Sequence, residues 1–393
     1  MTAGTATLLD SILARRLEAA ERFFPLESER LAVLCHRMAE RFARGGRLVA
    51  IGQSPVARSD VRHVTVEFVH PVIVGKRALP AIGIGPEGGP VGSQLELLLR
   101  PDDIVMAFEP DPSVAVARAF GCLTVAFTRT GAEWELLSDD ADPFIRQEIV
   151  EVTYHVLWEL VHVFFDHRGL LEGRTAAPSH DAGAASFLYP FLAEAETDLQ
   201  SVIDDVRRSV LAKCDEVGAL RTQTLRDNRE VLLTAAAALR KRFTAGGQVL
   251  ALGNGGSATD AMDIVADLRD PPHGWPRRPA LDLTEDTAIL TAIANDIGVD
   301  AIFSRQVIAH GRAGDVLVAI STSGNSASVL TALVEARRRG LVTMAFVGYD
   351  GGEVAARSLA DYVVVTRSEH IPRIQEAQAS ALHALRELVE CHD

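Results

Sequence analysis

A short pattern that occurs once in each half of the chain constrains the fold more than any other feature. Residues 41–52 read RFARGGRLVAIG, and residues 242–253 read RFTAGGQVLALG. Each copy is the end of a helical pattern, a Gly-Gly helix stop, an apolar run typical of a buried strand, and a glycine turn. Because the repeat has a long period, it predicts a duplicated domain rather than a solenoid of short repeats.

The register of this repeat continues along both halves. Segments with matching polar and apolar positions follow in the same order: Asp60–Phe68 with Asp260–Leu268, Asp103–Phe108 with Asp315–Ile320, and Gln147–Val161 with Gln375–Val389. Gly, Ala, Pro, Ser and Asp cluster between the halves, as they do in linkers. We therefore predict an N-terminal domain of residues 1–171, a linker of residues 172–196 and a C-terminal domain of residues 197–393.

Apolar runs and helical patterns alternate within each half. The apolar runs lie near residues 47–52, 79–84, 103–108 and 123–128, and then near 248–253, 279–283, 315–320, 342–347 and 362–366. Short buried strands separated by helices are typical of a parallel sheet covered on both sides. The predicted fold class is therefore α/β, with two tandem modules that are each a parallel sheet flanked by helices on both faces.

Two polar loops of the C-terminal half follow apolar runs directly. One reads NGGSATD from Asn254, and the other reads STSGNS from Ser321. Such turns direct backbone N–H groups and hydroxyls at one point, with a helix N-terminus behind them, which suits a dianionic phosphate. Ligands of parallel sheets bind at the carboxyl ends of strands, where both loops fall. Together they predict a phosphorylated small molecule, whereas either loop alone could be ordinary turn chemistry.

Six motifs of the C-terminal half resemble those of the sedoheptulose 7-phosphate isomerase (phosphoheptose isomerase) family, which has the sugar isomerase (SIS) fold. The motifs are Gly253–Ser257, Leu290–Asp296, Phe303–Gln306, Ile320–Ser326, Gly348–Gly352 and Arg373–Glu376. The resemblance covers about residues 200–390, and the N-terminal half is a diverged copy. It implies two SIS-type modules.

The resemblance also implies a set of substrate-binding residues. Hydroxyls of the second loop would hold the phosphate, and the first loop with the Asn-Asp pair would bind sugar hydroxyls. The residues carried over are Asn254, Gly255, Gly256, Ser257, Asn295, Asp296, Ser321, Thr322, Ser323, Ser326 and Gln375.

The family's metal and acid–base set is a His and a Glu one helical turn apart, with a Gln and a His on the last helix. The N-terminal half keeps all four, as His63, Glu67, Gln147 and His155. The C-terminal half departs from the pattern and has Asp263, Asp267, Gln375 and His383. The resemblance implies a divalent metal, zinc first, on the N-terminal set, with the C-terminal set as the alternative. The catalytic candidates are Glu67, His155, Asp267 and His383.

The residues themselves leave simpler interpretations open. Positions i and i+4 of a helix share a face, so His63 and Glu67 can converge on one ion, and N and O ligands suit zinc. A single histidine such as His155, in a largely apolar helix, is more typical of a packed core residue. Asp263 and Asp267 could be solvated helix charges, and Asp267 is one methylene shorter than the family's Glu.

The N-terminal half has lost the phosphate loops. Its first loop reads QSPVARSD from Gln53, and its second has Glu109 and Asp111, which would repel a phosphate. The two halves therefore keep complementary parts of the family's site. We hypothesise a composite pocket in which His63 and Glu67 serve the phosphate held by residues 321–326.

The predicted activity is aldose–ketose isomerisation of a phosphorylated sugar of the sedoheptulose 7-phosphate type through an enediol. This reaction needs a group that moves a proton between adjacent carbons, a second for the oxygen proton, and stabilisation of the enediolate. The alternative is a non-catalytic sugar-phosphate-binding protein with a regulatory or assembly role, which the C-terminal departures favour. The family implies a homo-oligomer, here a dimer of tandem chains.

Charge and composition exclude several partners. The formal net charge of −14 argues against nucleic acid or an anionic membrane as partner. No signal peptide or transmembrane run is apparent, and four scattered cysteines are typical of a reduced, cytoplasmic protein. A GxGxxG pattern begins at Gly83, but Pro86 and Pro90 spoil the transition to a helix, so we expect no nucleotide cofactor.

Overall fold

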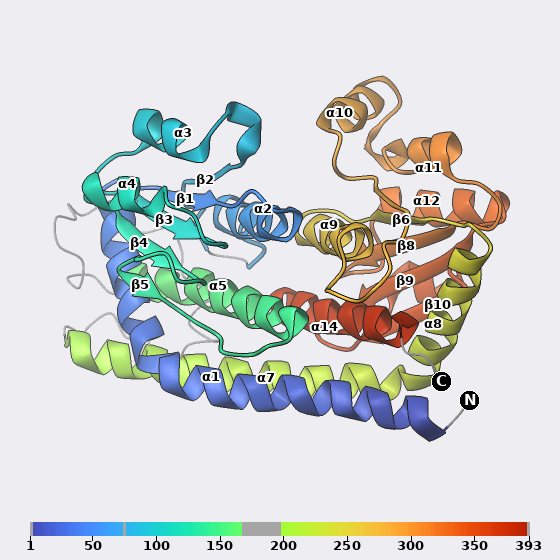
Figure 1. Ribbon diagram of the computed structural model, residues 1–393, viewed down its shortest axis with the longest axis horizontal. Helices are drawn as coiled ribbons and strands as arrows, with labels where there is room; N and C mark the ends of the chain where they lie inside the picture. The colour runs from blue at the N-terminus through green and yellow to red at the C-terminus, as the bar shows by residue number, and fades with distance from the viewer. Residues whose placement is uncertain (1–2, 74–75, 167–197, 391–393) are drawn as a thin grey trace. The chain divides into compact units, whose positions relative to one another are not determined.

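The computed structural model describes residues 3–73, 76–166 and 198–390 of the chain (Figure 1). The predicted linker, residues 172–196, lies outside the described residues. The chain divides into two compact units. The N-terminal unit comprises residues 19–215, and the C-terminal unit comprises residues 1–18 and 216–393.

The C-terminal unit is built on a parallel sheet of five strands. Its strands are β6 (Val249–Leu252), β7 (Ala280–Asp282), β8 (Val316–Ser321), β9 (Val342–Gly348) and β10 (Tyr362–Thr366), in the order β10-β9-β8-β6-β7. Its helices include α8 (Arg229–Thr244), α9 (Gly256–Arg269), α10 (Thr287–Asp296), α11 (Ser304–His310), α12 (Ala327–Arg338), α13 (Gly352–Ala356) and α14 (Ile371–Glu390), with a short 3-10 helix, η2 (Val299–Ala301).

Alternate residues of the C-terminal strands face two separate apolar layers. Val318 and Ile320 pack in one layer with residues of α8, α9 and α14, whereas Leu317 and Ala319 pack in the other with residues of α12. This alternation follows from the strand period of two residues. Both faces of the sheet are therefore covered by helices, as the apolar runs predicted.

The N-terminal unit repeats this design. Its strands are β1 (Leu48–Ile51), β2 (Ala81–Ile84), β3 (Ile104–Ala107), β4 (Leu123–Ala126) and β5 (Trp134–Glu135), in the parallel order β2-β1-β3-β4-β5. Its helices are α2 (Pro55–Val69), the 3-10 turn η1 (Pro86–Gly88), α3 (Val91–Leu98), α4 (Val114–Ala119) and α5 (Pro143–Asp166). Strand for strand, this is the order of the C-terminal sheet.

Two long helices contribute to both units. Helix α1 (Ala3–Ala43) passes from the C-terminal unit to the N-terminal unit at residue 19, and α7 (Leu199–Asp227) passes back at residue 216. In the C-terminal unit, Leu9 and Ile12 of α1 pack in the layer of α8, α9 and α14. The Arg15 guanidinium also forms an ion pair of 2.6 Å with Glu387.

The predicted α/β fold of two tandem modules is confirmed. Every predicted apolar run contains a strand, and the structure adds β5, a two-residue edge strand with only partly buried side chains. So short a strand carries no periodicity that a sequence pattern could reveal. Gly83 of the GxGxxG pattern lies in the edge strand β2, which leads into a 3-10 turn. In the described part of the chain, no helix is long and apolar enough to cross a membrane.

We predict that His162 of α5 makes the stability of the chain pH-dependent. Burial, reinforced by the Lys76 ammonium, lowers the pKa of His162 to about 4, although two carbonyl groups contact its ring nitrogens. The unfolded state therefore takes up a proton more readily than the folded state. Stability is fully present above about pH 6.5 and is lost as the pH falls towards 4, with about 2 kcal/mol lost between pH 7 and 5.

Urea unfolding at pH 7 and pH 5 tests this prediction. The His162→Gln variant should lose less stability between the two pH values than the unaltered chain. Equal losses in both proteins would show that other groups account for the acid sensitivity.

Candidate functional site

The two predicted phosphate loops meet at the point where the strand order of the C-terminal sheet reverses. The central strands β6 and β8 pair with each other, while β7 and β9 lie on opposite sides of this pair. In parallel sheets the loops at such a point form a crevice beyond the strand ends. Consistent with this, the Asn254 side-chain amide donates a hydrogen bond of 3.0 Å to the Ser328 hydroxyl. The structure therefore brings both loops together.

The second loop is held in a tight turn by its own hydroxyls. The Gly324 amide donates to Ser321 Oγ over 3.1 Å, and the Asn325 amide donates to Ser323 Oγ over 3.2 Å. Gly324 has a φ of +65°, and a Cβ there would lie 2.4 Å from the Gly351 carbonyl oxygen, so only glycine fits. Helix α12 begins directly after Ser326. A ring of hydroxyls in front of a helix N-terminus is suited to an anion.

The first loop has the same relation to α9. Gly255, with a φ of +57°, precedes the helix, whose first residues are Gly256 and Ser257. In the C-terminal unit as described, no carboxylate is bonded to the Asn254 or Gly255 amide. These backbone donors are available to a ligand.

Asn295 and Asp296 lie at the end of α10, and both are exposed. The Asn295 amide donates to Asp296 over 2.7 Å. No hydrogen bond joins either side chain to the two loops within the residues that the structure covers. Their predicted contact with sugar hydroxyls stays a prediction.

Asp267 and His383 form a buried pair between α9 and α14. His383 Nε2 lies 3.8 Å from Asp267 Oδ2, and both residues are less than a tenth exposed. Burial raises the pKa of the Asp267 carboxyl to about 6, against the opposing effect of His383 and Arg386. A carboxyl with such a pKa is half ionised close to neutral pH, which suits a group that accepts and returns a proton.

The other two members of the C-terminal set flank this pair on the same helices. Asp263 lies one turn before Asp267 on α9 and is partly buried, and Gln375 lies on α14 and is buried. A metal role for the C-terminal set stays a prediction.

Arg386 is a residue beside this pair that the motif comparison missed. It lies one turn after His383 on α14, is buried, and stacks over the Trp275 ring with its guanidinium carbon 4.9 Å from the centroid. One guanidinium nitrogen donates to Glu390. Attraction between Arg386 and Asp267 affects the pKa of both groups. Its only signal in the sequence is its position one turn after His383 on the same helix.

The first loop and the Asp267–His383 pair lie at opposite ends of α9. Gly256 is the first residue of this helix, and Asp267 belongs to its last turn. The rise between them is about 16 Å, which exceeds the length of an extended seven-carbon sugar phosphate.

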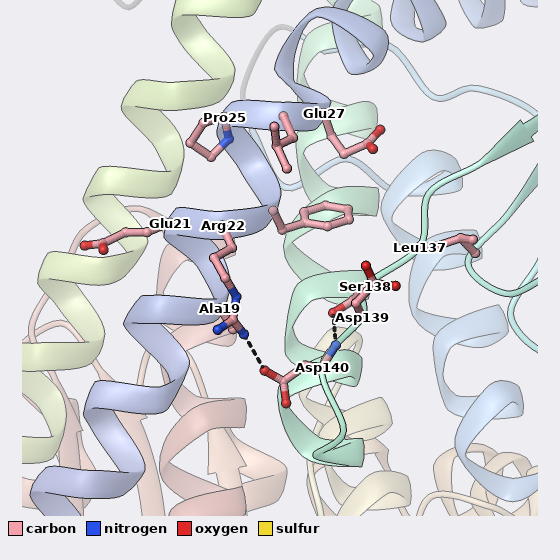
Figure 2. A pocket seen from close by; sticks show the side chains of 11 residues that line it. Ala19, Glu21, Arg22, Pro25, Glu27, Leu137, Ser138, Asp139 and Asp140 are labelled. Carbon is pink, nitrogen blue, oxygen red and sulfur yellow. Dashed lines mark hydrogen bonds and ion pairs between the residues drawn. The ribbon is translucent and has the colours of Figure 1, made fainter.

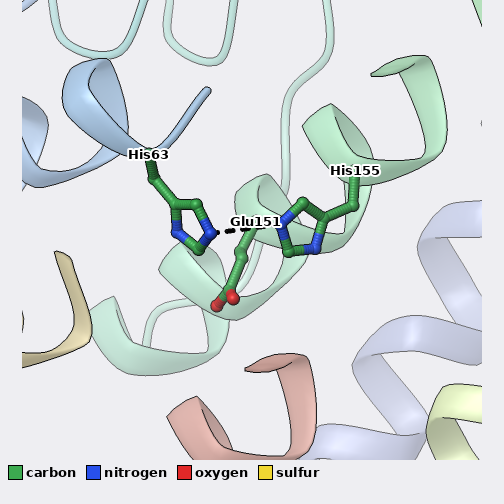
Figure 3. Close-up of side chains that lie close together, drawn as sticks. All are labelled: His63, Glu151 and His155. Carbon is green, nitrogen blue, oxygen red and sulfur yellow. Dashed lines mark hydrogen bonds between the residues drawn. The ribbon is translucent and has the colours of Figure 1, made fainter. Parts of the chain in front are cut away.

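The N-terminal unit brings together a different group of side chains, His63, Glu151 and His155 (Figure 3). One ligand atom from each lies within 4.8 Å of the others, and all three residues are buried. His63 Nε2 is 3.3 Å from His155 Nε2 and 3.8 Å from Glu67 Oε1. Burial and the neighbouring His155 hold the pKa of His63 well below its usual range, so its imidazole is neutral. This group could bind a metal.

The structure adds Glu151 to the predicted N-terminal set. His63 and Glu67 lie one turn apart on α2, and Glu151 and His155 lie one turn apart on α5. Gln147 lies a further turn back on α5 and is buried as well, and its predicted metal role stays a prediction. Sequence reasoning missed Glu151 because the repeat pairs it with Ala379, so the family pattern marks no ligand there.

The first loop of the N-terminal unit is bound by its own acidic side chain. The Gln53 amide donates to Glu109 Oε1 over 2.5 Å, and the Ser54 amide donates to both Glu109 oxygens over 3.2 and 3.3 Å. Asp111 accepts from the Gln53 side chain over 3.1 Å. A carboxylate therefore occupies the N-terminus of α2, where an incoming phosphate would be repelled. The predicted loss of phosphate binding in this half stays a prediction, which the position of Glu109 supports.

A surface hollow of about 740 Å³ lies elsewhere in the N-terminal unit, along α1 at Pro25 (Figure 2). Acidic side chains line it together with apolar ones, and Arg22 is paired with Asp140 at 3.0 Å. None of the predicted site residues lines this hollow.

Comparison with known proteins places the chain. The SIS domain family matches residues 214–348. The phosphoheptose isomerase of Geobacter sp. (strain M21) is 41% identical over 191 residues, which cover 48% of this chain and 96% of the relative. The chain belongs to the phosphoheptose isomerase family of SIS-domain proteins. The homology lies in its C-terminal half, as the six motifs predicted.

Two solved structures match the fold over nearly the whole chain. The C-terminal domain of glucosamine-fructose-6-phosphate aminotransferase from Francisella tularensis has a TM-score of 0.55 at 10% identity, covering 95% of this chain and 94% of that one. Tagatose-6-phosphate ketose/aldose isomerase from Escherichia coli has a TM-score of 0.52 at 12% identity, covering 99% and 95%. At such identities the likeness shows the fold alone, which is that of tandem SIS modules.

We predict that Glu109 stabilises the N-terminal unit by accepting the free amides before α2. The Glu109→Ala variant should lose about 1 kcal/mol of unfolding free energy, because a charged acceptor at a helix N-terminus is removed. Urea unfolding measures the loss. Glu96→Ala, at an exposed position of α3, is the matched control and should change stability by less than about 0.5 kcal/mol. Equal effects of the two changes would contradict the role given to Glu109.

Proposed function

We propose that this protein is a sugar-phosphate isomerase that interconverts the aldose and ketose forms of a phosphorylated sugar of the sedoheptulose 7-phosphate type. The observation that carries the proposal is the pair of open loops at the reversal point of the C-terminal sheet, in a half homologous to phosphoheptose isomerases along nearly their whole length. The buried Asp267–His383 pair supports a reaction rather than binding alone.

In this proposal the phosphate binds to the second loop of the C-terminal unit. Hydroxyls of Ser321, Thr322, Ser323 and Ser326 and amides at the start of α12 would donate to its oxygens. The open amides of the first loop, with Asn295 and Asp296, would bind sugar hydroxyls. The loop glycines let the backbone approach the ligand closely.

Proton transfer is assigned to Asp267 and His383. Isomerisation moves a proton from one carbon to its neighbour through an enediol, while a second group passes a proton between the two oxygens. The Asp267 carboxylate would take and return the carbon proton, for which a pKa of about 6 is well matched to neutral pH. His383, 3.8 Å away, would serve the oxygens.

The first loop and the Asp267–His383 pair lie at opposite ends of α9. The proposal therefore includes a homo-oligomer, the predicted dimer of tandem chains, in which neighbouring chains complete each pocket. Helix α10 supports such an assembly, since none of its residues is buried although it is rich in apolar side chains. Ile297 and Val299, just after it, are 57% and 64% exposed. An apolar surface of this kind is typical of an interface.

We also propose that the metal of the N-terminal unit is zinc. The fit is chemical: imidazoles and carboxylates are the N and O ligands that zinc accepts. Bound zinc would supply a fixed positive charge to these buried groups.

A non-catalytic sugar-phosphate-binding protein is the second candidate. It is favoured by the aspartates at the His and Glu positions of the C-terminal half, because a side chain one methylene short can cost about 10²-fold in rate. In that case the loops would bind a sugar phosphate without converting it.

NMR of sedoheptulose 7-phosphate incubated with the purified chain tests the activity. We expect an aldose product, a kcat lower by at least about 10²-fold in Asp267→Asn with a KM little changed, and a raised KM in Ser323→Ala. No turnover, with thermal stabilisation by the sugar phosphate, would identify the binder instead.

A complementation experiment tests where the two ends of the site come from. We predict that Asp267→Asn and Ser323→Ala chains, each weakly active, regain activity when they are co-expressed, because some pockets then combine an intact loop with an intact acid–base pair. Absence of any gain would contradict pockets shared between chains. A loss of turnover in Glu67→Gln, with metal content unchanged, would then favour the composite pocket that uses His63 and Glu67.

A further inference from the structure

We propose that Arg386 of α14 is a catalytic residue whose guanidinium binds the two oxygens of the enediolate formed at Asp267 and His383. The inference rests on the isomerisation proposed above, and it deepens that proposal by naming the group that stabilises the intermediate. The resemblance to phosphoheptose isomerases does not supply this residue, because the last of the six matching motifs ends at Glu376.

The guanidinium of Arg386 is buried but only partly bonded. The residue is 2% exposed, and its Nη1 donates a hydrogen bond to Glu390. Among the residues that the structure describes, neither Nε nor Nη2 of Arg386 has a hydrogen-bond partner, although both atoms are buried. Of the five N–H donors of the guanidinium, the three on these two nitrogens therefore lack an acceptor. Such donors are costly to bury, and a native protein keeps them for a reason such as catalysis.

The two free nitrogens form one edge of the planar guanidinium. The N–H bonds of Nε and Nη2 point outward side by side, which is the fork that binds carboxylates and phosphates through two parallel hydrogen bonds. The guanidinium carbon lies over the Trp275 ring, 4.9 Å from its centroid, and Glu390 holds the Nη1 end. These two contacts fix the position of the guanidinium and leave the fork to a planar anion.

Arg386 lies beside the proposed acid–base pair. It comes three residues after His383 on α14, and residues at this spacing are neighbours on the surface of a helix. Asp267 lies on α9, which packs against α14. Burial raises the pKa of the Asp267 carboxyl, and the opposing attraction of His383 and Arg386 places both cationic groups near it. The carboxyl, the imidazole and the fork therefore come from two packed helices of one unit.

The isomerisation uses all three groups. The Asp267 carboxylate takes a proton from C1 of the ketose, the C–H electron pair forms the C1–C2 double bond, and the carbonyl electrons move to O2. The Arg386 fork donates to O2 and O1, which lie side by side in the planar cis-enediolate. Protonated His383 gives a proton to O2 and then takes the hydroxyl proton of O1. Asp267 returns its proton to C2, which completes the aldose.

The sugar reaches these groups by local movement of the chain. Asp267, His383 and Arg386 are each less than a tenth exposed. Trp275 lies against the guanidinium, is only partly buried and belongs to the segment of residues 270–279 between α9 and β7. Movement of this segment uncovers the fork, and its return shields the intermediate from water.

Turnover of sedoheptulose 7-phosphate by three variants tests this role. Arg386→Met should lower kcat at least about 10²-fold with KM little changed, because the fork meets its acceptor only as charge develops on the oxygens. Arg386→Lys keeps the charge but has no fork, so it should recover only part of this loss. Arg278→Met is the matched control, since Arg278 forms an ion pair of 3.2 Å with the same Glu390, and it should leave kcat little changed. Equal losses in Arg278→Met and Arg386→Met would overturn the proposal.

The Arg386→Met chain is expected to fold, which thermal unfolding checks. Methionine fills a similar space without a charge, and Glu390 keeps Arg278 as its partner.

Binding of a hydroxamate analogue of the phosphorylated sugar tests the fork without turnover. A hydroxamate carries two oxygens side by side in one plane, as the enediolate does. Arg386→Met should bind it at least about 10²-fold more weakly than the unaltered chain, while both bind inorganic phosphate equally. Equal affinities for the hydroxamate, or no binding to the unaltered chain, would overturn the role of Arg386. Absence of turnover, with hydroxamate binding that still depends on Arg386, would refute the isomerase and retain the fork as a site for a planar anion.

Discussion

Both modules depend on one constraint. The helix that follows the first strand needs a hydrogen-bond acceptor for the N–H groups at its N-terminus. The free N–H groups there must meet an anion, water or a side chain. The sheet order places the loop after the third strand of each module beside them. In the N-terminal unit this loop supplies the Glu109 carboxylate. In the C-terminal unit it supplies Ser321 and Ser323, whose hydroxyls brace their own turn and leave the amides to a ligand. The different side chains of this loop thus leave one module with its amides bonded to a carboxylate and the other with amides open to a ligand.

The buried ionisable side chains between the helices behind these loops also differ between the two modules. Between α2 and α5, the imidazoles of His63 and His155 and the carboxylate of Glu151 lie within 4.8 Å of one another, a buried group that could bind a metal. Between α9 and α14, the buried guanidinium of Arg386 attracts Asp267, and its positive charge would oppose a divalent ion beside it. The same pair of helices therefore carries a His-Glu-His group in one module and an Asp-His pair beside an arginine in the other.

The sequence predicted the architecture because its strongest signals are periodic. The RFARGGRLVAIG repeat revealed the duplicated module, and the Gly-rich loops marked two strand ends as candidate binding loops. It missed β5, which is too short to show a period, and it missed Glu151 and Arg386, since each is defined by its neighbours across a helix interface. It foresaw that Glu109 would repel a phosphate, but not that its carboxylate fills the loop. A periodic pattern in the sequence does not reveal which side chains of distant segments contact each other.

The burial of Asp267 bears on whether the C-terminal half catalyses or only binds. Keeping an ionisable pair away from water costs stability, and a protein that only binds a phosphate gains nothing from one in the last turn of α9, remote from its loops. A pKa near 6, a histidine within 4 Å and an arginine that draws the carboxyl back towards ionisation are instead what proton transfer at neutral pH requires. The acid–base role proposed for Asp267 thus rests on its burial, its raised pKa and the histidine beside it, and not on the length of its side chain.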